Sequence, residues 1–288
     1  MQPTFVLVHG AFSNSFAFAP LQAELALHGH RSAAVDLPGH GFAATHPPAY
    51  QCPQDPAGLA AEPGTIRGVT LADNAAHLIR VLERAKANGP VILVSHSRGG
   101  LTATAAANAR PDLIDHLVYV SAWCPVDLAV GDYYAEPEMA AVDSAALTRG
   151  MAGDPAQLGL LRVNFRTADP AVLAALKAAF LADGTDEELL AILNTFQPDE
   201  NLDAGTRADR AQAATWGRIP RTYVRLARDA AIPPAAQDRL IREGDALTPD
   251  NQYDVRTLDS SHLKWLLQPA PAAHQLAQIA TLTSRPTP

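Results

Sequence analysis

The chain has 288 residues, of which 48% are hydrophobic and 18% charged, and its formal net charge at pH 7 is -8. This length suits one large α/β domain with an inserted subdomain, and no apolar run is long enough to span a membrane. The acidic balance and the scattered basic residues argue against nucleic-acid binding, which requires a basic face.

The N-terminus and the cysteines indicate the compartment. A strand pattern at 4–8 begins almost at once, without the basic and apolar segments of a targeting signal, so we expect a cytoplasmic protein. Cys52 and Cys124 are too few for a disulfide framework and lack the spacing of metal ligands. A single bridge between them is an open alternative.

The first part of the chain alternates between strand and helix patterns. Short apolar runs predict strands at 4–8 and 31–37. Helical spacing of apolar residues predicts a helix at 16–28 and another that starts after the capping residue Thr70 and ends near Asn88. A strand, a helix and a second strand at this spacing imply a parallel crossover connection.

Residues 91–101 place one serine between a buried strand and a helix. Four branched apolar residues predict the strand, and the alanine-rich run at 100–109 predicts a helix that lies close to a sheet. The tight turn between them needs small residues two positions before and after its centre, and Ser95 and Gly99 stand there. The central residue, Ser97, is then strained and exposed, as a nucleophile must be, although a plain strand-to-helix turn is the alternative.

The alternation stops after a fourth strand pattern at 115–121. Helical patterns near 136–149, 170–182 and 186–196, with hardly a strand among them, predict an inserted helical cap. Strand patterns resume at 220–226 and 253–258, and a last helix is predicted at 271–282. We therefore predict an α/β fold, a six-stranded and mostly parallel sheet flanked by helices, formed by residues 1–125 and 216–288, with residues 126–215 as the cap.

A serine nucleophile needs a general base and an acid that orients the base. Among ten histidines, His262 alone has a suitable place, in the loop between the last strand and the last helix. Asp229, which follows the fifth strand, is the expected acid, and Asp127, past the fourth strand, is the rival. In a parallel sheet the residues after the strand ends meet at one edge, so we expect Ser97, Asp229 and His262 to converge there.

The chain resembles the α/β-hydrolase superfamily in the order Ser97, Asp229, His262 and in His9-Gly10 after the first strand. The resemblance covers nearly the whole chain, the cap included. It implies an oxyanion hole formed by the backbone N–H groups of Ala11 and Arg98. His9 and His96 are expected to line the site or support its backbone.

Within the superfamily the chain is most similar to small serine esterases related to plant methylesterases and hydroxynitrile lyases. The segments 5–11, 229–237 and 261–262 carry this similarity, and the first two sheet strands of larger members are missing here as they are there. In the lyases a threonine follows the first histidine and a lysine follows the catalytic one. Here Gly10 and Leu263 stand at those positions, which favours the esterases.

Three features depart from the family pattern. Ser95 stands where glycine is usual, and Arg98 is a charged residue directly after the nucleophile. The third is the proline-rich loop at 42–69, an extension that forms either part of the rim of the site or a plain surface excursion.

The resemblance implies a carboxylesterase-type serine hydrolase that cleaves an ester or lactone through an acyl-enzyme, without metal or organic cofactor. Lyase or perhydrolase chemistry on the same three residues, and a ligand receptor with the same fold, are the alternatives. We expect a small to medium, largely apolar ester as substrate, and a monomer or homodimer. Aromatic residues expected at the cavity, with core packing as the alternative for each, are Phe12, Phe16, Trp123, Tyr133, Tyr134, Phe165, Phe180 and Trp216.

Overall fold

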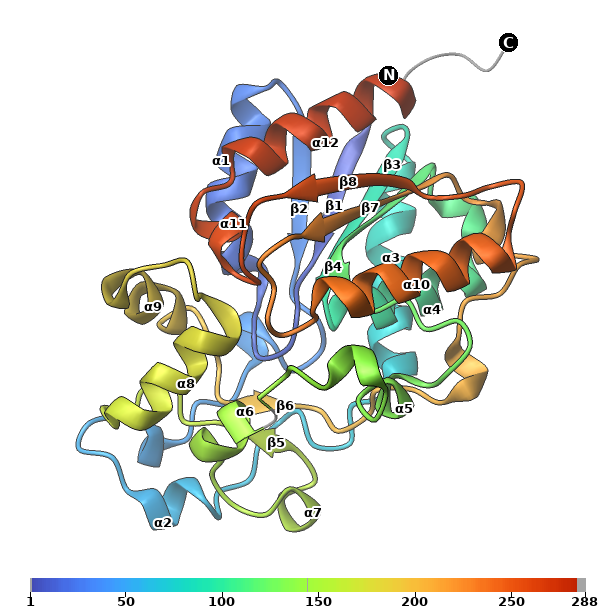
Figure 1. Ribbon diagram of the computed structural model, residues 1–288. Helices are drawn as coiled ribbons and strands as arrows, with labels where there is room; N and C mark the ends of the chain where they lie inside the picture. The colour runs from blue at the N-terminus through green and yellow to red at the C-terminus, as the bar shows by residue number, and fades with distance from the viewer. Residues whose placement is uncertain (1, 144, 284–288) are drawn as a thin grey trace.

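The computed structural model describes residues 2–143 and 145–283, so residues 1, 144 and 284–288 of the predicted core and cap ranges lie outside it. Its centre is a six-stranded sheet in the order β2-β1-β3-β4-β7-β8, and every neighbouring pair is parallel (Figure 1). The strands are β1 (Thr4–Val8), β2 (Arg31–Val35), β3 (Val91–Ser97), β4 (His116–Ala122), β7 (Arg221–Leu226) and β8 (Asp254–Leu258). The predicted α/β fold with six strands is confirmed.

Helices cover both faces of this sheet (Figure 1). One face carries α1 (Ala19–Leu27), α11 (Lys264–Leu267) and α12 (Ala270–Thr283), and the other α3 (Leu71–Lys86), α4 (Gly99–Ala109) and α10 (Pro234–Leu247). Because successive side chains of a strand point to opposite faces, Phe5 and Leu7 belong to the first core, and Val6 and Val8 to the second. A sheet covered on both faces explains the unbroken apolar runs in the sequence.

The segment between β4 and β7 forms a separate layer at one end of the sheet (Figure 1). Its helices are α5 (Val130–Tyr133), α6 (Ala145–Gly150), α7 (Pro155–Leu158), α8 (Pro170–Phe180) and α9 (Asp186–Leu193). It also holds a short antiparallel pair of strands, β5 (Leu161–Arg162) and β6 (Asp199–Glu200), which the sequence pattern did not predict.

The continuous helix predicted at 136–149 is wrong. Residues Pro137–Met139 form one 3-10 turn, and α6 begins only at Ala145; residue 144 of the predicted helix lies outside the described residues. Ion pairs explain the difference, because Arg239 of α10 lies 2.5 Å from the Glu136 carboxylate and 3.1 Å from that of Glu138. These contacts bind the segment to the core.

The loop at 42–69 packs against the inserted layer. A 3-10 turn at Gly41–Ala43 overlaps its start, and the loop contains a second 3-10 turn at Pro48–Tyr50 and the short helix α2 (Pro56–Leu59). Arg162 is fully buried beneath the loop, and its Nη1 donates to the backbone oxygens of Leu59 at 2.9 Å and Glu62 at 2.6 Å. The loop is therefore tied to β5 by the buried guanidinium.

The sequence predicted no membrane span and left a bridge between the two cysteines open. Among the helices of the described residues, none is both long and apolar enough for a membrane span. Cys52 is exposed and Cys124 is buried, and both are free thiols, so the alternative of a bridge between them is wrong.

We predict that Arg162→Ala strongly destabilises the protein. Its Nε and Nη2 contact both Asp199 oxygens, at 2.6 and 2.7 Å, and the substitution leaves that buried carboxylate unpaired, which costs about 3–5 kcal/mol. The matched control is Arg228→Ala, which breaks a two-point pair with Asp259 on the surface and should barely move the urea midpoint. Equal midpoint shifts in the two variants would contradict this account.

Candidate functional site

Ser97 lies at the end of β3 in a sharp turn. Its φ is 54°, in the left-handed region that side chains rarely adopt, as predicted for the centre of this turn. A Cβ at Gly99 would lie 2.4 Å from the His9 backbone oxygen, and a Cβ at Gly10 would lie 2.8 Å from the Ser97 Cβ. Only glycine fits at these two positions, which lets the loop after β1 approach the serine closely.

Ser97, His262 and Asp229 form one row of hydrogen bonds. Ser97 Oγ lies 2.9 Å from His262 Nε2, and His262 Nδ1 lies 2.6 Å from Asp229 Oδ2. A proton on Nδ1 then faces the carboxylate and leaves Nε2 free to accept from the serine hydroxyl. The structure thus brings together the three residues predicted from separate strand ends.

The Asp229 carboxylate is held on all sides. Its Oδ1 accepts the backbone N–H groups of Ala231 at 2.7 Å and Ile232 at 2.9 Å, and its Oδ2 also accepts from the Ser121 hydroxyl at 2.6 Å. Ser121 was missed in the sequence, although its position at the end of the fourth strand is a usable signal. The rival Asp127 is exposed, and its backbone N–H donates to Glu243, so it stands outside this row.

The loop that carries His262 is fixed from several directions. The His96 ring lies 3.1 Å from the His262 backbone oxygen, and the Leu263 N–H donates to the Phe180 oxygen at 3.0 Å. Asp183 accepts the Ser261 N–H at 2.9 Å. The position of the imidazole therefore depends on contacts from both the core and the inserted layer.

The backbone N–H groups of Ala11 and Arg98 follow Gly10 and Ser97, and both residues line the cavity above Ser97. Among the described residues, neither amide donates in a turn, loop or cap hydrogen bond. Two N–H groups without such a backbone partner, near a hydroxyl, are what an oxyanion hole requires.

The cavity has a volume of about 330 Å³ and a mostly apolar wall. Of the aromatic residues expected there, five line it: Phe12, Trp123, Tyr134, Phe165 and Phe180. Phe196 and the aliphatic side chains of Leu147, Leu161, Ile232 and Leu263 complete much of the wall. The loop at 42–69 contributes no residue to the cavity in the part of the chain that the structure describes, so it packs beside the inserted layer rather than at this rim.

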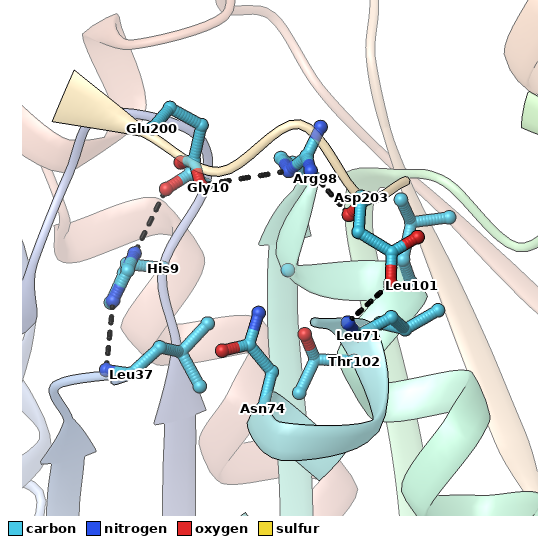
Figure 2. Close-up of a pocket in the computed structure, with 11 residues that line it drawn as sticks. His9, Gly10, Leu37, Leu71, Asn74, Arg98, Leu101, Thr102, Glu200 and Asp203 are labelled. Atoms are coloured by element: carbon cyan, nitrogen blue, oxygen red, sulfur yellow. Dashed lines mark hydrogen bonds and ion pairs between the residues drawn. The ribbon is translucent and has the colours of Figure 1, made fainter. Parts of the chain in front are cut away.

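Charged side chains along the cavity wall have partners of opposite charge. Arg98 Nε lies 3.8 Å from Glu200 Oε1 (Figure 2), and Arg149 Nη1 lies 2.9 Å from Asp143 Oδ2. The wall is therefore apolar with paired charges, which suits a neutral ligand.

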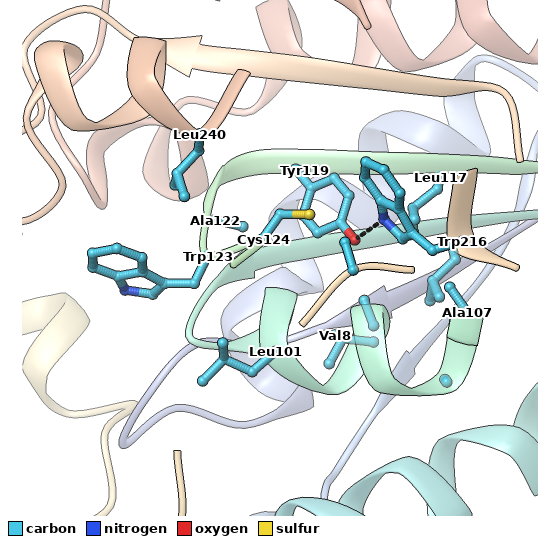
Figure 3. Close-up of a cluster of buried hydrophobic side chains, with 14 of the residues drawn as sticks. Val8, Leu101, Ala107, Leu117, Tyr119, Ala122, Trp123, Cys124, Trp216 and Leu240 are labelled. Carbon is cyan, nitrogen blue, oxygen red and sulfur yellow. Dashed lines mark hydrogen bonds between the residues drawn. The ribbon is translucent and has the colours of Figure 1, made fainter. Parts of the chain in front are cut away.

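Three of the expected cavity residues lie elsewhere. Trp216 is fully buried in the core, where its Nε1–H donates to the Tyr119 hydroxyl at 2.9 Å (Figure 3). The Tyr133 hydroxyl hydrogen-bonds to Glu243, which turns its ring toward α10 instead of the cavity. Phe16 is 66% exposed on the outer surface. The positions of these residues in the sequence did not determine where their rings point.

His9 is buried beside the site as a neutral imidazole. Its Nδ1 lies 2.8 Å from the Gly10 oxygen, and its Nε2 accepts the Leu37 N–H at 3.3 Å, so one nitrogen carries a proton and the other does not. Burial, followed by the nearby His40 charge, lowers the pKa of His9 to about 3. Burial also lowers the pKa of His96 well below its usual value, so both rings support the site in their neutral forms.

The sequence matches the model of the Alpha/beta hydrolase family over residues 5–275. Methylesterase 9 of Arabidopsis thaliana is 25% identical over 96% of this chain and 97% of its own length. Alpha-hydroxynitrile lyase of the same plant is 31% identical over 42% of this chain and 40% of its own length. A solved pyrethroid hydrolase structure has a similar fold, with a TM-score of 0.71, 20% identity and 98% coverage of both chains. These relatives confirm the resemblance stated from the sequence.

The low pKa of His9 predicts acid sensitivity. The unfolded chain takes up a proton at this residue below about pH 6.5, whereas the folded chain does so only near pH 3, so its contribution to stability is present above pH 6.5 and is lost as the pH falls. As the pH falls from 6 to 4, the free energy of unfolding of His9→Asn should therefore decrease less steeply than that of the wild type. The two slopes should differ by up to about 1.4 kcal/mol per pH unit. Urea titrations across this range test it, and parallel curves for the variant and the wild type would contradict it.

Proposed function

The chain belongs to the alpha/beta hydrolase family, and we propose that it hydrolyses a neutral carboxylic ester or lactone through an acyl-enzyme on Ser97. The observation that carries the proposal is the row of hydrogen bonds from Ser97 through His262 to Asp229, which opens into an apolar cavity. The methylesterases among the relatives support ester hydrolysis as the reaction.

In the first half-reaction, His262 Nε2 accepts the proton of Ser97 as Oγ attacks the carbonyl carbon. The electron pair of the carbonyl bond moves to its oxygen, which accepts hydrogen bonds from the Ala11 and Arg98 amides. Asp229 stabilises the imidazolium. The intermediate then collapses, and the leaving alcohol takes the proton from His262. Water repeats the sequence on the acyl-enzyme and releases the acid.

The cap, in this proposal, is the inserted segment 126–215. Its residues Tyr134, Phe165, Phe180 and Phe196 line the cavity, whereas the segments 1–125 and 216–288 carry the reacting groups. The cap therefore selects the substrate, and the core performs the chemistry. A cavity of about 330 Å³ with this lining suits a small to medium apolar acyl or alcohol group.

The wall beside His262 favours hydrolysis over lyase chemistry. Leu263, directly after the histidine, is buried at the cavity, and Gly10 follows His9. The lyases that the chain resembles carry a lysine and a threonine at these positions. Leu263 has no ammonium group, and Gly10 has no hydroxyl, so the polar groups of the lyases are absent from these two positions.

Ser97→Ala should lower the turnover of p-nitrophenyl butyrate by about a millionfold, because it removes the nucleophile, and Asp229→Asn should lower it by about 10⁴-fold, because the imidazole loses its orienting acid. Asp127→Asn is the matched control and should retain full turnover. Initial rates, with circular dichroism to verify folding, test this. Turnover retained in folded Ser97→Ala would refute the assignment.

The paired charges of the wall predict a preference for neutral esters. The carboxylate of p-nitrophenyl hemisuccinate would lie unpaired in the cavity, at a cost of about 3 kcal/mol or more. Its kcat/KM should therefore be about 100-fold below that of p-nitrophenyl butyrate, whose acyl chain has the same length. Similar kcat/KM values for the two esters would contradict a neutral substrate.

A further inference from the structure

We propose that residues 200–203, here called the strap, fix the spacing of the two oxyanion-hole amides, with Glu200 as the positioning residue. The inference rests on the proposed function, because it concerns the N–H groups of Ala11 and Arg98. These groups lie on different loops, after β1 and after β3. An oxyanion hole works only when both donors are held close to the position of the developing charge.

Glu200 holds the loop after β1. It is 2% exposed, and its Oε2 accepts the N–H of Phe12 at 2.9 Å. Phe12 has a φ of 57°, a conformation that costs energy for a phenylalanine and persists only when its surroundings hold it. The carboxylate thus fixes the peptide that joins Ala11 to Phe12, the unit directly after the first donor.

The other half of the strap holds the turn after Ser97. Arg98 Nη2 donates to the Asn201 backbone oxygen at 3.1 Å and to Asn201 Oδ1 at 3.0 Å. It also donates to the Asp203 backbone oxygen at 2.6 Å (Figure 2). Asp203 Oδ2 in turn accepts the Leu71 N–H at 2.9 Å, at the start of α3. The side chain of the second donor is therefore tied to the same four residues, and these are anchored to a core helix.

The negative charge of the buried Glu200 is paired with His40 and Arg98. Burial alone would raise the pKa of Glu200. Three interactions outweigh burial and lower this pKa to about 2: the hydrogen bond to His40 at 3.3 Å, the charge of His40 and the charge of Arg98. Burial likewise lowers the pKa of His40, yet the Glu200 carboxylate outweighs that effect and raises it. Because the carboxylate is paired on two sides, it can lie beside an oxyanion site without repelling the oxyanion.

Substitutions at Glu200 separate position from charge. Glu200→Ala removes the acceptor of the Phe12 N–H and should lower kcat about 100-fold with little change in KM, the effect of a misplaced oxyanion donor. Glu200→Gln keeps the length and one acceptor oxygen for the Phe12 N–H, but its NH2 group would face the two Asn201 donors that Glu200 Oε1 accepts, so we expect a kcat loss of only about tenfold, well short of that of Glu200→Ala. Glu200→Asp keeps the charge but is one methylene shorter, so we expect a kcat loss close to that of Glu200→Ala.

Asp199→Asn is the matched control, because Asp199 is the neighbouring buried carboxylate and pairs with Arg162, away from both amides. It should lower the urea midpoint and leave the kcat of the folded protein unchanged. All rates are measured with p-nitrophenyl butyrate below the unfolding transition, and the concentration of active sites is taken from the p-nitrophenol burst.

An unchanged kcat in Glu200→Ala would overturn the inference, and so would an equal kcat loss in Asp199→Asn. An active Glu200→Asp beside an inactive Glu200→Gln would also overturn it, because charge and not reach would then matter. If Glu200→Ala does not fold, the Gln and Asp variants decide alone. These failures leave Ser97-dependent turnover of the wild type intact, whereas a wild type without such turnover would refute the proposed function and the inference together.

Discussion

The close approach of the β1 loop to the turn at Ser97 is the constraint on which the site depends. Gly10 and Gly99 allow this approach, because a Cβ on either would collide with the Ser97 side chain or the His9 backbone. The parallel pairing of β1, β3, β4, β7 and β8 then brings Ala11, Ser97, Asp229 and His262 to one edge of the sheet. The tight turn and the shared edge together bring Ser97, His262 and Asp229 into one row beside the loop of Ala11, and the function that we propose rests on this arrangement.

Polar contacts join the inserted layer to the loops after β1, β3 and β8. On one side Asp183 and the Phe180 oxygen hold the loop of His262, and on the other Glu200 and Asp203 hold the two donor loops. Phe180 and Glu200, which line the cavity, therefore also hold loops at its floor. This explains how a layer without reacting groups of its own contributes to the reaction we propose.

The sequence predicted the sheet and the three residues Ser97, Asp229 and His262, because each follows a strong strand pattern and parallel strands end at one edge. It did not predict where Trp216 and Tyr133 point, since an aromatic ring satisfies a core and a cavity wall equally well. The helix at 136–149 failed because ion pairs to Arg239 of α10, a helix itself not predicted, override the local pattern. Glu200 had no local signal at all, because the Phe12 amide that it binds lies 188 residues away in the chain.

The most direct test of the account is to trap the covalent intermediate. Wild-type protein is mixed with a p-nitrophenyl ester, quenched in acid within milliseconds and digested, and the peptides are analysed by mass spectrometry. We predict that one acyl group is attached to the peptide that contains Ser97, with its fragment ions locating the acyl group on that serine. An acyl group on another residue, or p-nitrophenol release by the wild type with no covalent adduct at any quench time, would contradict the account.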